Sequence, residues 1–177
     1  MKKNLTKVVL ATLIAAAPLA ASDFTYNTNS LFALEGGYNS MNEDGAGGGL
    51  DLADNFGSFG LKLGAESQNY RIFVNANYEA ISNFDYAYLY GVALQYKFNF
   101  TESANFFLGV NGGYANMKHE NGLKISDPYF GGDAGFNFHA SELIDLELAA
   151  RVNLVDNNLV DNIVTGYASI IFKYQMD

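Results

Sequence analysis

The sequence of 177 residues predicts an all-β fold, in which eight antiparallel strands close into a single up-and-down barrel. Apolar residues recur at every second position in eight successive segments, which is the pattern of strands with two unlike faces. No helical period separates these segments. The 14 phenylalanines and 12 tyrosines are residues that favour strands.

The composition excludes several classes of site. The chain has no cysteine, which excludes disulfides, thiolate zinc sites, cysteine nucleophiles and a lipoprotein anchor. Two histidines are too few for a His-rich metal site, and we predict neither a metal nor another cofactor. The formal charge of −9 argues against nucleic acid as a partner, because proteins that bind phosphate backbones carry clustered lysine and arginine.

The first 22 residues have the three regions of a cleaved secretory signal peptide. Lys2, Lys3 and Lys7 form a basic start, residues 8–19 are apolar, and Ala20-Ala21-Ser22 offers small residues at a cleavage site. The apolar run is shorter than the roughly 20 residues of a membrane-spanning helix. We therefore predict a signal peptide over residues 1–22 and one barrel domain over residues 23–177. Loss of three lysines changes the formal charge from −9 to −12.

Each predicted strand has one face that is apolar along its whole length. The strand ranges are 31–39, 58–66, 70–79, 86–98, 105–115, 129–138, 144–154 and 163–174. The apolar faces of the first four strands are Phe32, Leu34, Gly36 and Tyr38; Phe59, Leu61, Leu63 and Ala65; Tyr70, Ile72, Val74, Ala76 and Tyr78; and Tyr86, Tyr88, Tyr90, Val92, Leu94, Tyr96 and Phe98. Those of the last four are Phe106, Leu108, Val110, Gly112 and Tyr114; Phe130, Gly132, Ala134, Phe136 and Phe138; Ile144, Leu146, Leu148, Ala150, Val152 and Leu154; and Val164, Gly166, Ala168, Ile170, Phe172 and Tyr174. Such a face touches either hydrocarbon or a dry core.

The opposite face carries charged, amide and small residues. Its charged members are Glu35, Lys62, Glu66, Arg71, Glu79, Lys97, Asp133, Asp145, Glu147, Arg151 and Lys173. Its amides are Asn75, Asn77, Gln95, Asn111, Asn137 and Asn153, and its small residues are Gly37, Gly60, Gly64, Gly91, Ala93, Gly109, Gly113, Gly131 and Gly135. Five of the seven bases that remain after loss of residues 1–22 thus lie on this one face, so the surplus negative charge lies in the connections.

Side-chain volume decides which face points inward. A soluble lipocalin-like barrel would turn the apolar face inward, whereas an outer-membrane barrel turns it toward lipid. The interior of eight strands is only just wide enough to be filled by side chains, so the glycine-rich face fits it and the aromatic face does not. The rings also gather at strand ends, as Tyr70 and Tyr78 do, which is typical of the aromatic girdles at the two headgroup regions. We therefore predict an eight-stranded antiparallel up-and-down transmembrane β-barrel.

Connection lengths predict the orientation of the barrel. With a periplasmic N-terminus, the connections 40–57, 80–85, 116–128 and 155–162 face outward and are longer on average than the turns 67–69, 99–104 and 139–143. Long external loops and short periplasmic turns are the expected asymmetry. Both chain ends would then lie in the periplasm.

The pattern resembles a known family. Eight alternating strands, an inward set of Glu, Lys and Arg, and a last strand, Gly166-Tyr167-Ala168-Ser169-Ile170-Ile171-Phe172-Lys173-Tyr174, make the chain similar to the small outer-membrane barrels of the OmpA/OmpX type from Gram-negative bacteria. The resemblance implies recognition of the last strand by the barrel-assembly machinery, although Gln175-Met176-Asp177 follow the final aromatic residue. It also implies a lumen without an open water pore. The periplasmic peptidoglycan-binding domain of full OmpA has no counterpart in the sequence.

The inward charges are expected to be paired, because a lone ion in a narrow barrel is costly to desolvate. A short turn at 67–70 would place Glu66 opposite Arg71 and Lys62 opposite Asn75, and Asp133 would lie diagonally across from Arg151. The set could form an ion gate or proton path, or a plug that holds the lumen shut. We favour the plug.

Three further candidates are weaker. Residues 44–54 partly resemble a calcium-binding glycine/aspartate repeat, but such repeats work in stacked copies and only one imperfect copy is present. His139-Ala140-Ser141-Glu142 has the His-x-Ser spacing seen in lipid A deacylase barrels, but it falls at a periplasmic turn, and no orienting acid is evident on the next strand. The predicted external loops are acidic and could bind divalent ions or a cationic partner, or simply be solvated. Their acids are Glu43, Asp44, Asp51, Asp54, Asp85, Asp156 and Asp161, against Lys118 and Lys124.

These observations predict a bacterial outer-membrane protein that is not an enzyme and has a structural or surface-interaction, adhesin-like role. The alternative is a small channel, or an OmpW-like conduit for small or hydrophobic solutes. The predicted partners are outer-membrane lipid and lipopolysaccharide, the barrel-assembly machinery during biogenesis, and an extracellular partner of the acidic loops.

Overall fold

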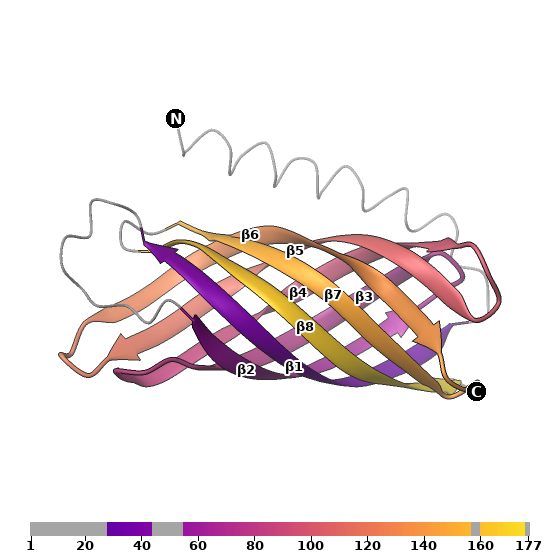
Figure 1. Ribbon diagram of the computed structural model, residues 1–177, viewed down its shortest axis with the longest axis horizontal. Helices are drawn as coiled ribbons and strands as arrows, with labels where there is room; N and C mark the ends of the chain where they lie inside the picture. Colours follow the sequence, from indigo (N-terminus) through magenta and orange to yellow (C-terminus); the bar gives the residue numbers. More distant parts are fainter. Residues whose placement is uncertain (1–27, 44–54, 157–159, 176–177) are drawn as a thin grey trace.

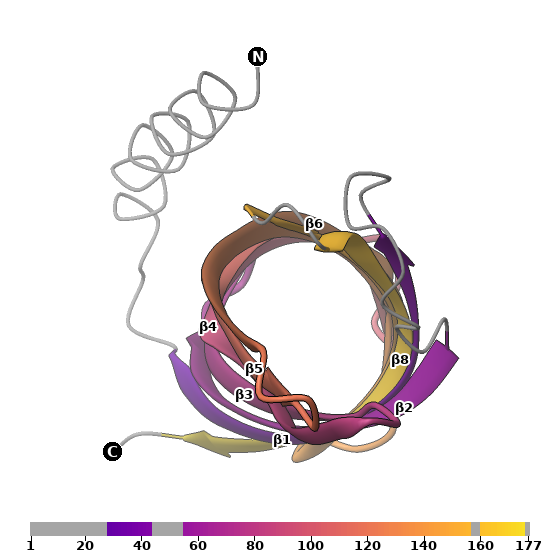
Figure 2. The same cartoon turned by 90° about the vertical axis from the view of Figure 1, so that its left-hand side faces the viewer.

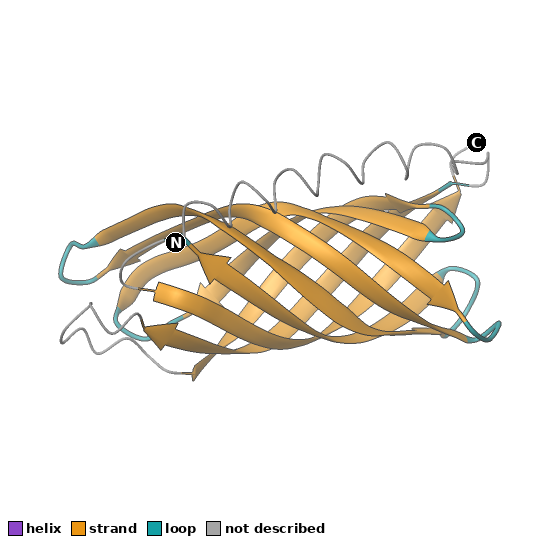
Figure 3. Cartoon of the chain, turned by 90° about the horizontal axis from the view of Figure 1, so that it is seen from above, coloured by secondary structure: helices purple, strands orange, loops and turns teal. Residues whose placement is uncertain are grey.

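Eight antiparallel strands form a closed barrel in the computed structural model, which describes residues 28–43, 55–156 and 160–175 (Figures 1 and 3). The strands are β1 (Asn29–Glu43), β2 (Asn55–Glu66), β3 (Tyr70–Ala80), β4 (Phe84–Asn99), β5 (Ala104–His119), β6 (Lys124–His139), β7 (Ile144–Val155) and β8 (Val160–Gln175). Each strand pairs with its sequence neighbours, and β1 pairs with β8. Closure leaves no free sheet edge, and the predicted fold class is confirmed. The described residues include no helix of the length and apolarity needed to cross a membrane.

The outward and inward faces are those that the alternation predicts. Leu63 and Val74 are each 61% exposed, whereas Lys62 and Asn75 on the adjacent positions are 2% and 7% exposed. Seen along its axis, the barrel is a single ring of strands (Figure 2). The charged face therefore lines the lumen and the apolar face surrounds the barrel.

Inward glycines make room for the lumen side chains. At eight of them, a Cβ would come closer than 3.0 Å to a neighbouring atom: Gly37, Gly60, Gly64, Gly91, Gly109, Gly113, Gly131 and Gly135. On the outer face, by contrast, a Cβ at Gly36 or Gly166 would meet nothing within 4 Å. The small residues on the inner face are thus required by space, as the sequence predicts for a narrow barrel.

Aromatic residues on neighbouring strands contact one another near both ends of the barrel. At the end that carries both termini of the described barrel, the rings of Tyr70 and Tyr96 lie 5.1 Å apart. At the opposite end, the rings of Tyr78 and Tyr88 lie 5.5 Å apart. The two groups flank an aliphatic band, as expected for the two headgroup regions of a bilayer.

The strands extend further than predicted at the end of the barrel away from the chain termini. Much of the predicted loops 80–85 and 116–128 is strand, because β4 begins at Phe84, β5 continues to His119 and β6 begins at Lys124. The reason is that the two faces exchange character at this end, with apolar side chains pointing inward and polar side chains pointing outward. Met117 and Ile125 point inward and are buried, while their outward neighbours are polar. The remaining turns, 81–83 and 120–123, contain Asn83 and Gly122 with positive φ values of 68° and 91°.

Two predictions lie outside the described residues. The signal peptide over residues 1–22 stays a prediction. So does the acidic loop 44–54 with its resemblance to a calcium-binding repeat. Among the residues of the three described ranges, no group of three or more His, Cys, Asp or Glu side chains is arranged to hold a metal ion.

Candidate functional site: the barrel lumen

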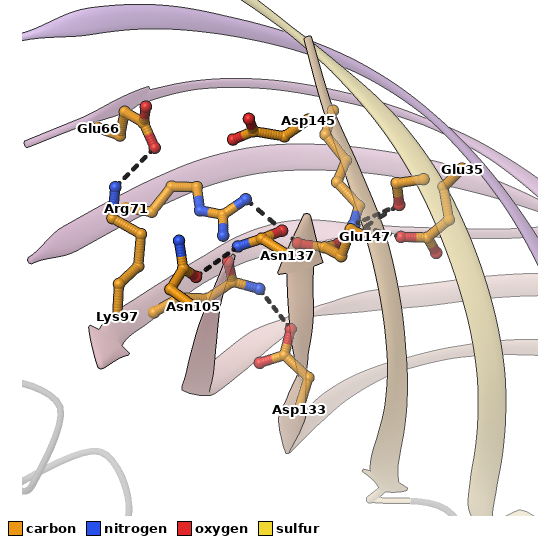
Figure 4. A network of polar contacts seen from close by, with 12 residues as sticks. Glu35, Glu66, Arg71, Lys97, Asn105, Asp133, Asn137, Asp145 and Glu147 are labelled. Carbon is orange, nitrogen blue, oxygen red and sulfur yellow. Dashed lines mark hydrogen bonds and ion pairs between the residues drawn. The ribbon is translucent and has the colours of Figure 1, made fainter. Parts of the chain in front are cut away.

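All the predicted lumen charges point into the barrel. Ten of the eleven are buried: Glu35, Lys62, Glu66, Arg71, Glu79, Lys97, Asp133, Asp145, Glu147 and Arg151. The side chain of Lys173, near the end of β8, is 12% exposed. The strand period of two places these side chains on the same face of every strand, and closure brings them together (Figure 4).

Two carboxylates at the centre hold three cations. The Lys62 ammonium lies 2.6 Å from Glu35 Oε2 and 2.9 Å from Glu147 Oε1. Arg151 donates two hydrogen bonds to the Glu35 carboxylate, at 3.0 and 2.9 Å. Arg71 Nη1 donates to the second oxygen of Glu147 at 3.2 Å. Each of these carboxylates therefore binds two cations, an arrangement that offsets the cost of desolvating all five groups.

Aromatic rings inside the lumen cover the same cations. The Lys62 ammonium and the Arg151 guanidinium each lie 4.4 Å from the centre of the Tyr167 ring. The Arg71 guanidinium lies 5.4 Å from the rings of both Phe73 and Phe107. Cation–π contacts at such distances add to the stabilisation, especially in desolvated surroundings.

Two more ion pairs lie nearer the end with the chain termini. Lys97 Nζ lies 2.8 Å from Glu66 Oε2, and Lys173 Nζ lies 2.8 Å from Asp145 Oδ1. The same Asp145 oxygen is 2.7 Å from His139 Nδ1. The ion-pair network thus continues from the middle of the barrel to this opening.

Asp133 and Glu79 have neutral hydrogen-bond partners. Asp133 Oδ2 accepts from Gln95 Nε2 at 2.6 Å and from the Tyr167 hydroxyl at 3.0 Å. Glu79 Oε2 accepts from Asn39 Nδ2 at 2.9 Å. These carboxylates belong to the hydrogen-bond network of the lumen, and amides or a hydroxyl rather than cations contact them.

The predicted register is confirmed in part, but the partners differ from those expected. Glu66 lies opposite Arg71, and Lys62 opposite Asn75. Asp133 lies directly opposite Arg151, so the predicted diagonal placement is wrong. Instead, Glu66 on β2 pairs with Lys97 on β4, and Arg151 on β7 pairs with Glu35 on β1. Neither pair of strands is hydrogen-bonded, because long side chains in a narrow lumen reach past the neighbouring strand.

Several functional partners were not predicted from the sequence. Tyr167, Asn39, Thr165, Ser169 and Asn105 all point into the lumen and are buried. Ser169 Oγ lies 3.2 Å from Lys62 Nζ, and Thr165 donates to Asn39 at 2.5 Å. The sequence could have indicated their inward position, since each residue falls in step with the other inward-facing positions of its strand.

An apolar layer lies inside the barrel at the end away from the chain termini. It is formed by buried residues from the extended strands and from the turn after β3: Met41, Phe56, Ile81, Ala87, Leu89, Ala115, Met117, Ile125, Tyr129, Val155, Val160 and Ile163. Phe84 packs against it. We call this cluster the apolar lid. It was not predicted, because the inward face was expected to be polar along its whole length.

The His139–Ser141 candidate does not form a catalytic arrangement. The expectation that no acid orients His139 is wrong, because Asp145 lies opposite it on β7 and contacts Nδ1. The other ring nitrogen, however, lies 3.2 Å from the Asn105 amide, and Ser141 Oγ accepts from the backbone N–H of Leu143 at 3.3 Å. His139 therefore contacts an amide where a catalytic base would contact the nucleophile.

The acidic residues predicted in external loops are only partly within the described ranges. Asp85 lies in β4 and forms an ion pair with Lys118 in β5, so both belong to strands. Asp44, Asp51 and Asp54 lie outside the described residues.

The fold is similar to those of solved bacterial outer-membrane barrels. The crystal structure of neisserial surface protein A (NspA) shares 15% identity, with 83% of this chain and 97% of that chain covered and a TM-score of 0.64. The N-terminal β-barrel domain of Pseudomonas aeruginosa OprF shares 10% identity, covering 84% and 99%, with a TM-score of 0.64. Ail, the attachment invasion locus protein of Yersinia pestis, shares 16% identity, covering 85% and 100%, with a TM-score of 0.57.

No protein-family profile and no curated protein sequence matches the chain. At these identities the structural likeness shows the fold. The chain has the fold of the small eight-stranded outer-membrane β-barrels of the OmpA/OmpX type.

Proposed function

We propose that this chain is an integral outer-membrane protein with a closed lumen, which acts through its stability in the membrane and through its external surface. The observation that carries the proposal is the filling of the lumen in two layers. Ion pairs and hydrogen bonds occupy the middle and the end near the chain termini, and the apolar lid occupies the other end. Interiors of eight-stranded barrels are narrow enough for side chains to fill.

The two layers oppose solute passage by different means. In the polar layer, Glu35 and Glu147 are 2% and 1% exposed and already bind protein cations, so a passing ion would have to displace these partners. In the apolar lid, Leu89 and Met117 are 2% and 1% exposed and offer an ion no replacement for its hydration shell. The geometry therefore favours a structural plug over an ion gate or proton path.

A surface-interaction role is supported by the extended strand ends. β5 and β6 continue past the apolar band with the polar outward residues Asn116, Lys118, Lys124 and Ser126, and we expect this part of the strands to project beyond the membrane. Ail, whose fold is similar, is called an attachment invasion locus protein. We extend this adhesin-like role to the present chain, with the acidic connections as the contact surface for an extracellular partner and with the last strand as the segment that the barrel-assembly machinery recognises.

Membrane fractionation combined with gel mobility tests the location. The full chain should be recovered in the outer-membrane fraction, and unheated samples should migrate differently from boiled samples, because a closed, fully hydrogen-bonded barrel resists detergent. Recovery in the soluble periplasmic fraction would contradict the proposal.

Conductance distinguishes the closed barrel from the alternative of a channel or OmpW-like conduit. The purified barrel in planar lipid bilayers should give no more conductance than a heat-denatured control. Steady conductance above that control would favour the channel.

We also propose that the chain is not an enzyme. Lipid A extracted from cells that express the wild type or the Ser141→Ala variant should have the same acylation pattern by mass spectrometry. Deacylated lipid A that appears with the wild type and is absent with Ser141→Ala would contradict this.

A further inference from the structure

We propose that the outer surface of β2 to β6 holds a phosphorylated lipid of the external leaflet, with an acyl chain over Ala76 and the phosphate at Lys118 and Lys124. This inference rests on the proposed outer-membrane location and names one lipid site on the barrel. It is carried by a hollow in the lipid-facing surface, by the row of residues that leads from it, and by the two lysines at the end of that row.

The hollow lies over Ala76, the small residue in a row of larger ones. Ala76 pairs with Leu61 on β2 and with Tyr90 on β4, so both flank it. Phe59 and Tyr78 close the side nearer the apolar lid. The hollow has a volume of about 340 Å³ and an almost entirely apolar lining. Because these side chains face outward from the barrel, hydrocarbon is the matching occupant.

The same face becomes polar in the direction of the extended strand ends. Tyr88 pairs with Asn116, and one step further Tyr86 pairs with Lys118. The rings of Tyr86 and Tyr88 are stacked with their centres 5.9 Å apart. The four residue-to-residue steps from Tyr90 to Tyr86 span about 14 Å at about 3.4 Å each, the scale of an acyl chain and its link to a headgroup. The surface thus changes from apolar to phenolic to cationic, in the order that matches the acyl chain, the linking groups and the anionic headgroup of a lipid.

Lys118 and Lys124 face each other directly across β5 and β6. Like charges in directly opposite positions of an antiparallel pair are destabilising, and an anion between them would reverse that effect. Asp85 contacts Lys118 and relieves part of the repulsion. Lys124 is exposed and has no acidic partner among the described residues, whereas the other bases in the described ranges each have one.

Charge complementarity therefore points to an anion, and the adjoining hollow makes it a lipid phosphate. An isolated surface phosphate would use the lysines without the hollow, and a neutral lipid would use the hollow without the lysines. Glu120 follows in the turn after β5, further from the apolar band, so the cationic pair lies between the membrane and the acidic end of the barrel.

Native mass spectrometry of the purified full chain in detergent micelles can test the site. The probes are diphosphorylated lipid A and the same lipid after enzymatic dephosphorylation, each titrated in separate samples. Wild type should bind the phosphorylated form more tightly. Lys124→Gln should weaken that binding about fivefold, as expected for one lysine beside an anionic headgroup, and Lys124→Arg should preserve it.

Two further variants, with opposite expected effects on lipid affinity, test the phosphate position and the hollow separately. Asp85→Asn releases Lys118 from its carboxylate and should strengthen binding of the phosphorylated lipid. Ala76→Phe fills the hollow and should weaken binding of both lipids, whereas the matched control Ala168→Phe, on the exposed outer face of β8, should leave it unchanged. Heat-dependent gel mobility identifies folded samples, and only those are compared.

Equal binding of the two lipids, or equal affinity of wild type and Lys124→Gln, would overturn the site. Displacement of the lipid by millimolar inorganic phosphate would also overturn it, in favour of a simple anion site. These failures are distinct from failure of the proposed location, because a chain without the lipid preference would still fractionate with the outer membrane.

Discussion

Glu35 is the residue on which the lumen network depends most directly, because Lys62 and Arg151 both contact its carboxylate. Glu35→Gln would leave two buried cations partly uncompensated and should lower the free energy of unfolding by about 3–5 kcal/mol. Urea unfolding in phospholipid vesicles measures this change. Glu79→Gln is the matched control, since an amide rather than a cation contacts Glu79, and it should cost about 1 kcal/mol. Equal losses in the two variants would show that the ion pairs do not set the stability.

Gly113 lies on the inner face of β5, where the lumen has no room for even one added methyl group. A Cβ there would lie 2.6 Å from the Gly91 Cα and 2.9 Å from the Tyr129 hydroxyl, and it would also meet the Tyr90 carbonyl oxygen. Gly113→Ala should therefore destabilise the barrel by about 1–3 kcal/mol in the same unfolding experiment. Gly36→Ala is the control, because its methyl group would meet nothing within 4 Å, and it should be neutral or slightly stabilising.

At the scale of the strand, the loss of folding free energy caused by a charge on the outer face depends on its position along the barrel axis. Val110 lies mid-strand on the outer face of β5 and is 40% exposed. Val110→Arg should cost about 2–4 kcal/mol, because hydrocarbon surrounds this position, whereas Ser126→Arg, on the outer face near the start of β6, should cost about 0–1 kcal/mol. The stability of each variant in lipid vesicles measures the difference. Wild-type stability of Val110→Arg would contradict the placement of this face against lipid.

The strands were predictable where one face is apolar and the other polar without interruption, as from Tyr70 to Tyr78. They were not predicted where the polarity inverts, as at Met117 and Lys118, because an outward-facing lysine in the pattern indicates a loop unless the membrane boundary is known. The apolar lid was missed for the same reason.

The members of the lumen network were predictable from strand parity, but most of their pairings were not. Glu147 on β7 binds Lys62 on β2 and Arg71 on β3, and none of these strands is hydrogen-bonded to β7. Such partners depend on closure of the barrel and on which side chains cross its lumen. Strand register, which a sequence can indicate, fixes neighbours within the sheet and leaves contacts across the lumen undetermined.

For the whole molecule, the proposed function makes the apolar lid and the polar network two barriers in series, so we expect conductance only when both are removed. Leu89→Ala with Met117→Ala removes volume from the lid alone and should leave the planar-bilayer conductance at the level of the denatured control. Lys62→Ala with Glu147→Ala thins the network alone, removes one cation with one carboxylate, and should also stay closed. The combined quadruple variant should show steady conductance, since the narrow lumen would then lack two large side chains of the lid together with its central ion pair. Each variant is first checked for heat-dependent gel mobility, so that loss of folding is not mistaken for closure. Conductance in either double variant would mean that a single layer closes the barrel and that the other is only packing.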